Sequence, residues 1–181
     1  MILASAGWNT AGIKVRQHGE EFSLVNWDTT LDEIDCYGGQ MLSVAREPGL
    51  PSMTLRCGSI YIAPKPDRVI IGATMEPGVV TDHADADTIA QLRAEAARLC
   101  PAIAGATEIE TWAGVRPGTL DHAPLLGSTR ADGLYVASGH YRNGILLAPV
   151  TARIMADMML DGTRGALAST FSPARFAAAT A

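Results

Sequence analysis

Cysteine is scarce in this chain, and long apolar runs are absent. Three cysteines occur in 181 residues, with no Cys-x-x-Cys pair, so a disulfide framework is not expected and the thiols are predicted to be free. No segment approaches the roughly 18 apolar residues of a membrane span. The first residues also lack the basic segment that begins a secretory signal. We therefore expect a cytoplasmic protein with no membrane association.

Positive charge is also in short supply. Lysine and arginine number 14 against 19 acidic residues, which gives a net charge of −5 and a pI of about 5.3. This balance argues against nucleic acid as a partner. The remaining composition, 48% hydrophobic and 18% charged, is that of a globular chain. Its length predicts one domain, or one large domain carrying part of another.

Local patterns predict several strands and two long helices, which indicates an α+β fold. The clearest hairpin joins 59–63 to 68–73 through the turn residues Pro64–Asp67. A helix is predicted over 85–100, with an aspartate cap and a stop at Pro101, and a second over 145–160. The other predicted strands are Met1–Ala6, Glu21–Asp28, Gln40–Ala45, Glu108–Ala113 and Leu134–Ser138.

The most informative stretch is a strand, a loop bounded by glycines and a helix, over 134–149. A helix N-terminus presents unpaired N–H groups and partial positive charge, and Gly139 and Gly144 permit close backbone approach by a ligand. The segment therefore suits an anionic or electron-rich ligand, although an ordinary connection between strand and helix has the same appearance. A nucleotide P-loop is excluded, because Ile145-Leu146 occupies the place of Lys-Ser/Thr.

Two further residues are candidates for substrate contact. Arg116 is predicted between a strand end and a Pro-Gly turn, where rigid flanks suit a two-pronged grip on a carboxylate. Tyr61 lies in a predicted strand and could offer its hydroxyl. The simpler interpretations are an exposed turn arginine and a packed tyrosine.

No constellation of side chains suggests a metal site or a catalytic acid, base or nucleophile. The acidic run at 82–87 contains His83, but acidic residues at this place are typical of a helix start. Neither a Ser-His-Asp triad nor a pair of carboxylates stands out. We expect no metal and no side-chain catalyst.

Five segments, in this order, resemble the C-terminal half of the FAD-dependent D-amino-acid oxidase family, and within it the glycine oxidases of thiamine biosynthesis. The last two segments are long and specific, whereas the others are individually weak. They are Gly39–Leu42, Tyr61–Pro64, Ile71–Met75, Trp112–Thr119 and Gly139–Pro149.

The resemblance implies a flavoprotein oxidoreductase with FAD as cofactor. It places substrate binding on Arg116, Arg142 and Tyr61, with no catalytic side chain. It implies oxidative deamination of a small amino acid such as glycine by oxygen, giving a keto acid, ammonia and hydrogen peroxide; sarcosine or another small amine stays open. The residues implied to face the flavin ring are Gly139, His140, Tyr141, Arg142, Asn143, Gly144, Ile145 and Leu146.

One family feature is missing from the sequence. No GxGxxG occurs, although the family holds the FAD pyrophosphate with this motif at the start of a Rossmann-like domain. The predicted organisation is therefore a strand of the FAD-binding domain at 1–8, a substrate-binding domain at 9–113, the C-terminal strand-loop-helix of the FAD-binding domain at 114–162, and a tail at 163–181. Its substrate-binding sheet is expected to be mixed antiparallel.

The missing motif leaves three interpretations open. The chain is a fragment, half of a split enzyme, or a non-catalytic module, either a degenerate remnant or a partner-binding subunit. As a fragment or half of a split enzyme, it is expected to be inactive alone. The expected partner is the missing N-terminal FAD-binding half. Without it, we expect a contiguous apolar face at the first strand and the flavin-facing loop, and a tendency to form homo-oligomers.

Overall fold

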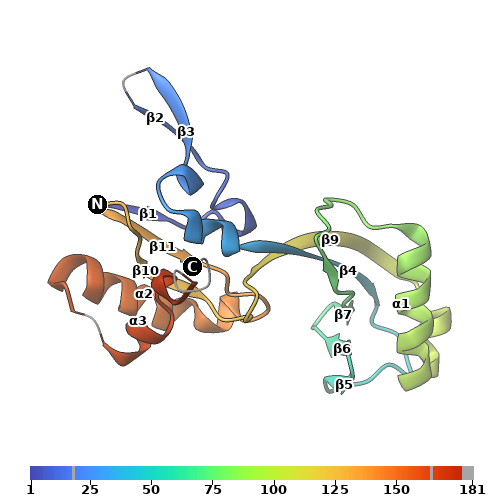
Figure 1. Cartoon of the computed structure of the whole chain (residues 1–181). Coiled ribbons are helices and arrows are strands. Elements are labelled where there is room, and N and C mark those ends of the chain that lie inside the picture. Colours follow the sequence, from blue (N-terminus) through green and yellow to red (C-terminus); the bar gives the residue numbers. More distant parts are fainter. Residues whose placement is uncertain (18, 164, 177–181) are drawn as a thin grey trace. The chain divides into compact units, whose positions relative to one another are not determined.

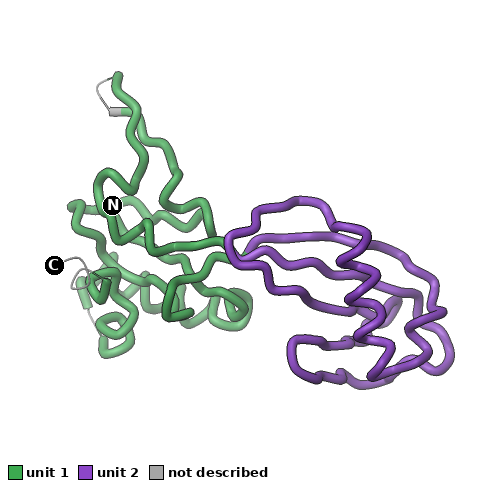
Figure 2. The backbone as a smooth tube through the Cα atoms, turned by 45° about the vertical axis from the view of Figure 1, so that its right-hand side comes forward, with its two compact units in different colours: residues 1–36, 116–181 green, residues 37–115 purple. Residues whose placement is uncertain are grey.

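A computed structural model describes residues 1–17, 19–163 and 165–176. Two compact units make up the chain (Figure 2): unit 1 combines residues 1–36 with 116–181, and unit 2 comprises residues 37–115. The chain passes between the units within strand β4 (Asp35–Ala45) and again within strand β9 (Glu108–Gly118). Residues 9–36, expected in the substrate-binding domain, group with unit 1, and the assignment of flavin or substrate to either unit stays a prediction.

Unit 2 is built on an antiparallel sheet (Figure 1). Its strands follow the order β5-β6-β7-β4-β8, and β9 also pairs with β4. The predicted hairpin is confirmed, and in it Tyr61 pairs with Gly72 and Ile62 with Ile71. The shorter strands of this sheet are β5 (Leu55–Cys57), β6 (Ile60–Pro64), β7 (Arg68–Gly72) and β8 (Glu76–Pro77).

Helix α1 (Ala86–Leu99) packs on one face of this sheet. It buries Ile89, Leu92 and Ala96, whose spacing puts them on a single stripe of the helix. The Asp85 carboxylate caps it by accepting a hydrogen bond from the Thr88 backbone N–H at 2.9 Å. The predicted helix and its cap are thus confirmed. The sheet side chains in this core are Leu42, Val44, Ile60, Ile62, Val69 and Ile71.

Unit 1 contains a three-stranded sheet of order β1-β11-β10. β1 (Ile2–Ala4) runs parallel to β11 (Leu134–Ser138), and β10 (Leu125–Ser128) is antiparallel to β11. Helix α2 (Gly144–Asp161) follows β11 and contacts the sheet. A separate hairpin joins β2 (Lys14–Gln17) to β3 (Glu20–Ser23). The buried residues of this core are Ala4, Leu24, Leu31, Ile34, Leu125, Leu134 and Val136. Within the described ranges, no helix is both long and apolar enough to cross a membrane.

Several predicted boundaries were wrong for reasons of tertiary structure. The strand predicted over 21–28 ends at Ser23, because a capping box with Asn26 starts a short 3₁₀ helix there. The strands predicted over 40–45 and 108–113 each extend to 11 residues. Those two strands pair with one another, so each supplies backbone partners that local alternation of side chains cannot reveal.

The segment after α2 also has more structure than a tail. Helix α3 (Ala166–Thr170) is followed by a 3₁₀ turn, Pro173–Phe176, in which Pro173 is fully buried. The Leu126 N–H donates to the Phe171 carbonyl at 2.8 Å, which ties this segment to β10. Residues 177–181, at the end of the predicted tail, lie outside the described residues.

Candidate functional site

Gly139, the first residue of the loop between β11 and α2, has a backbone conformation and surroundings that suit only glycine. Gly139 has φ +73°, and a Cβ there would lie 3.0 Å from Thr119 Cγ2 and 3.4 Å from the Leu125 nitrogen. Tyr141 donates its N–H to the Pro117 carbonyl at 2.6 Å. The segment after β9 and the loop before α2 are therefore packed directly against each other in unit 1.

An aromatic pair strengthens this contact. The rings of His122 and Tyr141 stack, with centroids 4.5 Å apart and an interplanar angle of 20°. Both residues have positive φ, 56° and 53°, which costs a non-glycine residue about 1–2 kcal/mol. Such strain persists only where the surroundings over-determine the conformation, as is common at functional sites.

The N-terminus of α2 faces solvent. Asn143 is the N-cap residue of this helix, and within the described residues its side chain makes no capping hydrogen bond. Ile145 is 96% exposed, and Leu146 is exposed as well. An 18-residue helix concentrates partial positive charge at this end. The first turn thus offers polar backbone and apolar side chains together, which suits a flat, electron-rich ligand.

Two of the three predicted substrate residues lie in unit 1 and one in unit 2. Arg116 is half-buried within β9 rather than at its end, because the strand continues through Pro117 to Gly118. Arg142 is exposed in the loop before α2, and Tyr61 is half-buried in β6 of unit 2. The Tyr141–Pro117 hydrogen bond places the segments that carry Arg116 and Arg142 next to each other.

His140, near the start of the loop, is half-buried and contacts α2. Its Nε2 is 2.9 Å from the Thr151 hydroxyl oxygen on α2. Burial lowers the pKa of its imidazole below the ordinary value, so the ring is neutral at neutral pH. We infer a structural role, in which His140 holds the loop on α2.

An apolar groove of about 540 Å³ opens beside this loop. β1 forms part of its wall through Leu3, which is 43% exposed, and only Ala4 of that strand is buried. The apolar face expected at the first strand is therefore present along β1 and this groove. α2 lines the groove mostly with small and apolar side chains, beginning at Gly144, and His140 reaches it from the loop. The residues lining it from α2 are Ala148, Thr151, Ala152, Met155, Ala156, Met159 and Leu160.

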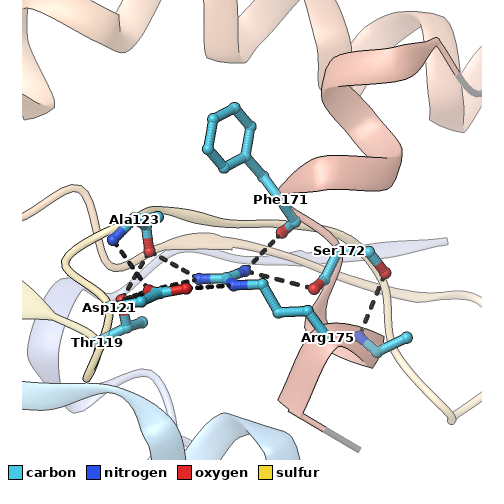
Figure 3. Close-up of polar contacts among 7 residues, drawn as sticks. Thr119, Asp121, Ala123, Phe171, Ser172 and Arg175 are labelled. Atoms are coloured by element: carbon cyan, nitrogen blue, oxygen red, sulfur yellow. Dashed lines mark hydrogen bonds and ion pairs between the residues drawn. The ribbon is translucent and has the colours of Figure 1, made fainter.

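An ion pair that the sequence analysis missed supports the segment after Arg116. Arg175 contacts Asp121 through Nε at 2.8 Å and Nη2 at 3.1 Å (Figure 3). The same guanidinium donates to the carbonyls of Phe171 and Ala123 at 2.9 and 2.8 Å. The available sequence signal was Ser-Pro turn chemistry at 172–173, just before this arginine.

Loss of this ion pair is expected to change the acid sensitivity of unit 1. The Arg175 guanidinium, followed by the Thr119 hydroxyl and the Ala123 N–H, holds the pKa of Asp121 well below its ordinary value of 3.8. A lowered folded-state pKa stabilises the fold above the unfolded-state pKa, and this stabilisation disappears as the pH falls through the acid range. We expect Arg175→Met to cost about 1–2 kcal/mol at neutral pH, allowing for partial exposure of the pair.

The measurement is urea unfolding followed by circular dichroism at a series of pH values between neutral and acid. Arg175→Met should lose stability at neutral pH and show a flatter pH dependence than the parent chain. Arg16→Met is the matched control, because its ion pair with Glu21 is long, 3.9 Å, and exposed. Equal pH profiles for the parent chain and Arg175→Met would contradict the assignment.

Comparison with known proteins identifies the class to which this fold and site belong. The family model for FAD-dependent oxidoreductases of the DAO type matches residues 9–158, so the chain belongs to that family. It is 38% identical over 160 residues to the glycine oxidase of Pseudomonas aeruginosa, covering 88% of this chain and 41% of that protein. It is 41% identical over 143 residues to the bifunctional protein ThiO/ThiG of Trichormus variabilis, covering 76% of this chain and 22% of that protein.

Solved structures give the same result. The glycine oxidase of Bacillus cereus superposes with a TM-score of 0.76 at 27% identity, covering 92% of this chain and 44% of that one. The glycine oxidase of Geobacillus kaustophilus superposes with a TM-score of 0.72 at 37% identity, covering 79% and 40%. The predicted family is confirmed. The chain spans less than half the length of these relatives.

The family is FAD-dependent, and the residues around the loop fit part of that cofactor. The solvent-facing N-terminus of α2 and the apolar side chains of Ile145 and Leu146 match a flat ring that carries electron-rich atoms on one edge. Gly139 allows the backbone to pack closely beneath this turn. The role of each predicted flavin-facing residue, from Gly139 to Leu146, stays a prediction.

Proposed function

We propose that this chain is the substrate-binding and flavin-ring-facing portion of an enzyme that deaminates a small amino acid, such as glycine, oxidatively. The observation that carries the proposal is the contact between the Arg116 strand and the loop leading to the uncapped end of α2, in a member of this family. When bound, FAD supplies the electron acceptor. Amino acid, oxygen and water give keto acid, ammonia and hydrogen peroxide.

The chain's own residues bind and orient in this proposal. Arg116 holds the substrate carboxylate through paired, charge-assisted hydrogen bonds, and its position within a strand keeps the guanidinium in place. Arg142 adds a second positive charge from the loop, and Tyr61 offers a hydroxyl to the amino acid. The start of α2, near Gly144, would hold an electron-rich edge of the flavin ring through its backbone N–H groups and partial positive charge.

The pyrophosphate-binding half is proposed to come from sequence outside these 181 residues and to dock on the β1 edge and the apolar groove. β1 pairs with β11 on one side, and the described residues place no strand on its other side. A parallel strand can add at that edge, and the small residues Ala148, Ala152 and Ala156 of α2 leave room for a helix. A Rossmann-type βαβ unit supplies both elements.

The test combines the purified chain with a separately produced N-terminal part of the Pseudomonas aeruginosa glycine oxidase. We expect the mixture to retain flavin through gel filtration and to form peroxide when glycine is added. Leu3→Lys, on the groove, should prevent association, because a buried unpaired charge is costly. Leu167→Lys is the control, since this exposed leucine lies outside the groove lining.

A colourless mixture without association would overturn the proposal. It would favour the second candidate, a non-catalytic remnant, which is suggested by the lack of GxGxxG in the chain. A third outcome is that the two parts associate and retain flavin but form no peroxide with glycine, sarcosine or other small amino acids. This outcome would separate cofactor binding from the proposed reaction. That outcome would overturn the reaction alone.

A further inference from the structure

Three neighbouring strands of unit 2 place Met41, Gly72 and Tyr61 in one row across the sheet. Met41 of β4 pairs with Gly72 of β7, and Gly72 pairs with Tyr61 of β6. Directly paired residues share a face of the sheet. The next residues, Leu42 and Ile62, belong to the core under α1, so the row lies on the opposite face.

Gly72 has no side chain, so the Tyr61 side chain can lie over it and contact Met41. The Tyr61 hydroxyl donates to Met41 Sδ at 3.6 Å, so the ring extends past the central strand. A Cβ on Gly72 would lie 2.7 Å from Tyr61 Oη, 2.8 Å from its Cζ and 3.0 Å from Met41 Cε. The φ of Gly72 is not in the left-handed region, so space rather than backbone conformation is the reason for glycine here.

The sheet around the row cannot easily move to make room. Gln40, next to Met41, donates its backbone N–H to Thr74 Oγ1 at 2.8 Å and its side-chain amide to Glu76 at 3.1 Å. Its side-chain carbonyl accepts the N–H of Asp85 at 2.7 Å, at the start of α1. β4 is thus fixed on the α1 side, and a methyl group at Gly72 must displace the tyrosine ring instead.

We propose that Gly72 is a positioning residue: the missing side chain at this place sets where the Tyr61 hydroxyl lies, and so how that hydroxyl meets an amino-acid substrate. The second clause rests on the proposed function, whereas the first stands on unit 2 alone. Gly72→Ala adds a single methyl group within 3 Å of the ring. The ring then rotates away from Met41 and takes the hydroxyl with it.

The first test uses the full chain labelled with 3-fluorotyrosine and observed by ¹⁹F NMR. Tyr61→Phe identifies the signal of Tyr61 among the four tyrosines. Gly72→Ala is expected to shift that signal and leave the other three in place. The matched control is Gly114→Ala in β9, also in unit 2, where a Cβ would meet nothing within 4 Å. An unshifted Tyr61 signal in folded Gly72→Ala would overturn the proposal.

A labelled methionine methyl group provides the second readout. Met41→Leu identifies the Met41 methyl signal, and Gly72→Ala should shift it through the moved ring. In a Tyr61→Leu background, the same substitution should shift it much less, because the ring is gone. Equal shifts in both backgrounds would show that the added methyl acts on Met41 directly, which contradicts positioning through Tyr61.

The substrate clause is tested in the complemented enzyme. Gly72→Ala should raise KM for glycine on the order of 10-fold, and Gly114→Ala should leave it unchanged. In a Tyr61→Phe background, Gly72→Ala should have a smaller effect on KM. An NMR shift without any activity in the complemented parent would leave positioning intact and overturn the proposed function. An NMR shift with unchanged KM in an active enzyme would overturn the substrate clause.

Discussion

Arg116→Ala is expected to lower glycine-dependent peroxide formation in the complemented enzyme by about 10²–10⁴-fold in kcat/KM while flavin stays bound. The proposed guanidinium–carboxylate pair contains two charge-assisted hydrogen bonds, each worth about 1.5–3 kcal/mol, and 1.4 kcal/mol corresponds to a tenfold change. Most of this loss should be in KM, because a carboxylate is bound in the ground state as well as in the transition state.

Two further variants make the Arg116 result specific. Arg116→Lys keeps the charge but lacks the planar fork, so it should recover only part of the activity. Arg153→Ala is the control for loss of a positive charge in unit 1, because this side chain is exposed and its contact with Asp157 is long, 3.8 Å. Turnover by Arg116→Ala at the parent's kcat/KM would rule out the assigned role.

The second large effect is expected from a single methyl group at Gly139. Gly139→Ala forces a left-handed conformation on alanine, which costs about 1–2 kcal/mol, and presses the new Cβ against Thr119. Overpacking of this kind adds about 1–3 kcal/mol. We expect a loss of about 2–5 kcal/mol in the free energy of unfolding, measured in urea.

Gly133→Ala separates the two causes. Gly133 has φ +76°, close to the +73° of Gly139, but the nearest atom to its added Cβ is 4.0 Å away. It should therefore show the conformational cost alone, about 1–2 kcal/mol. If Gly139→Ala and Gly133→Ala lose the same stability, the packing of Gly139 on Thr119 contributes nothing. If the packing matters, Gly139→Ala should also weaken flavin retention in the complemented enzyme, because the loop cannot stay in place.

Some elements could be predicted from the sequence because their causes are local. The hairpin at 60–72 is specified by apolar residues on either side of a Pro-Asp turn, and α1 by an apolar stripe with a capping aspartate before it. The strand, loop and helix from 134 to 161 follow from one apolar run, two glycines and a helical pattern. Gly162 ends that helix with φ 65°, as expected of a C-terminal glycine.

Other features depended on contacts between distant parts of the chain. The pairing of β4 with β9 lengthens both strands and carries Arg116 inside one of them, which local alternation could not indicate. The sequence predicts a tail around Arg175, yet this residue binds Asp121, 54 residues away in sequence. The stacked pair of His122 and Tyr141 required positive φ at two non-glycine residues, which no sequence pattern reports.

The sequence by itself determined the family, the α+β class and the loop before α2, because the residues that specify them lie within short segments. The tertiary structure decided which side chains meet. It joined the Arg116 strand to that loop through Tyr141 and Pro117, and it left β1 exposed along an apolar groove. It also placed the Tyr61 hydroxyl oxygen 2.7 Å from the position that a Cβ on Gly72 would take. Contacts of this kind depend on strand register and on packing across many residues, and a short segment of sequence specifies neither.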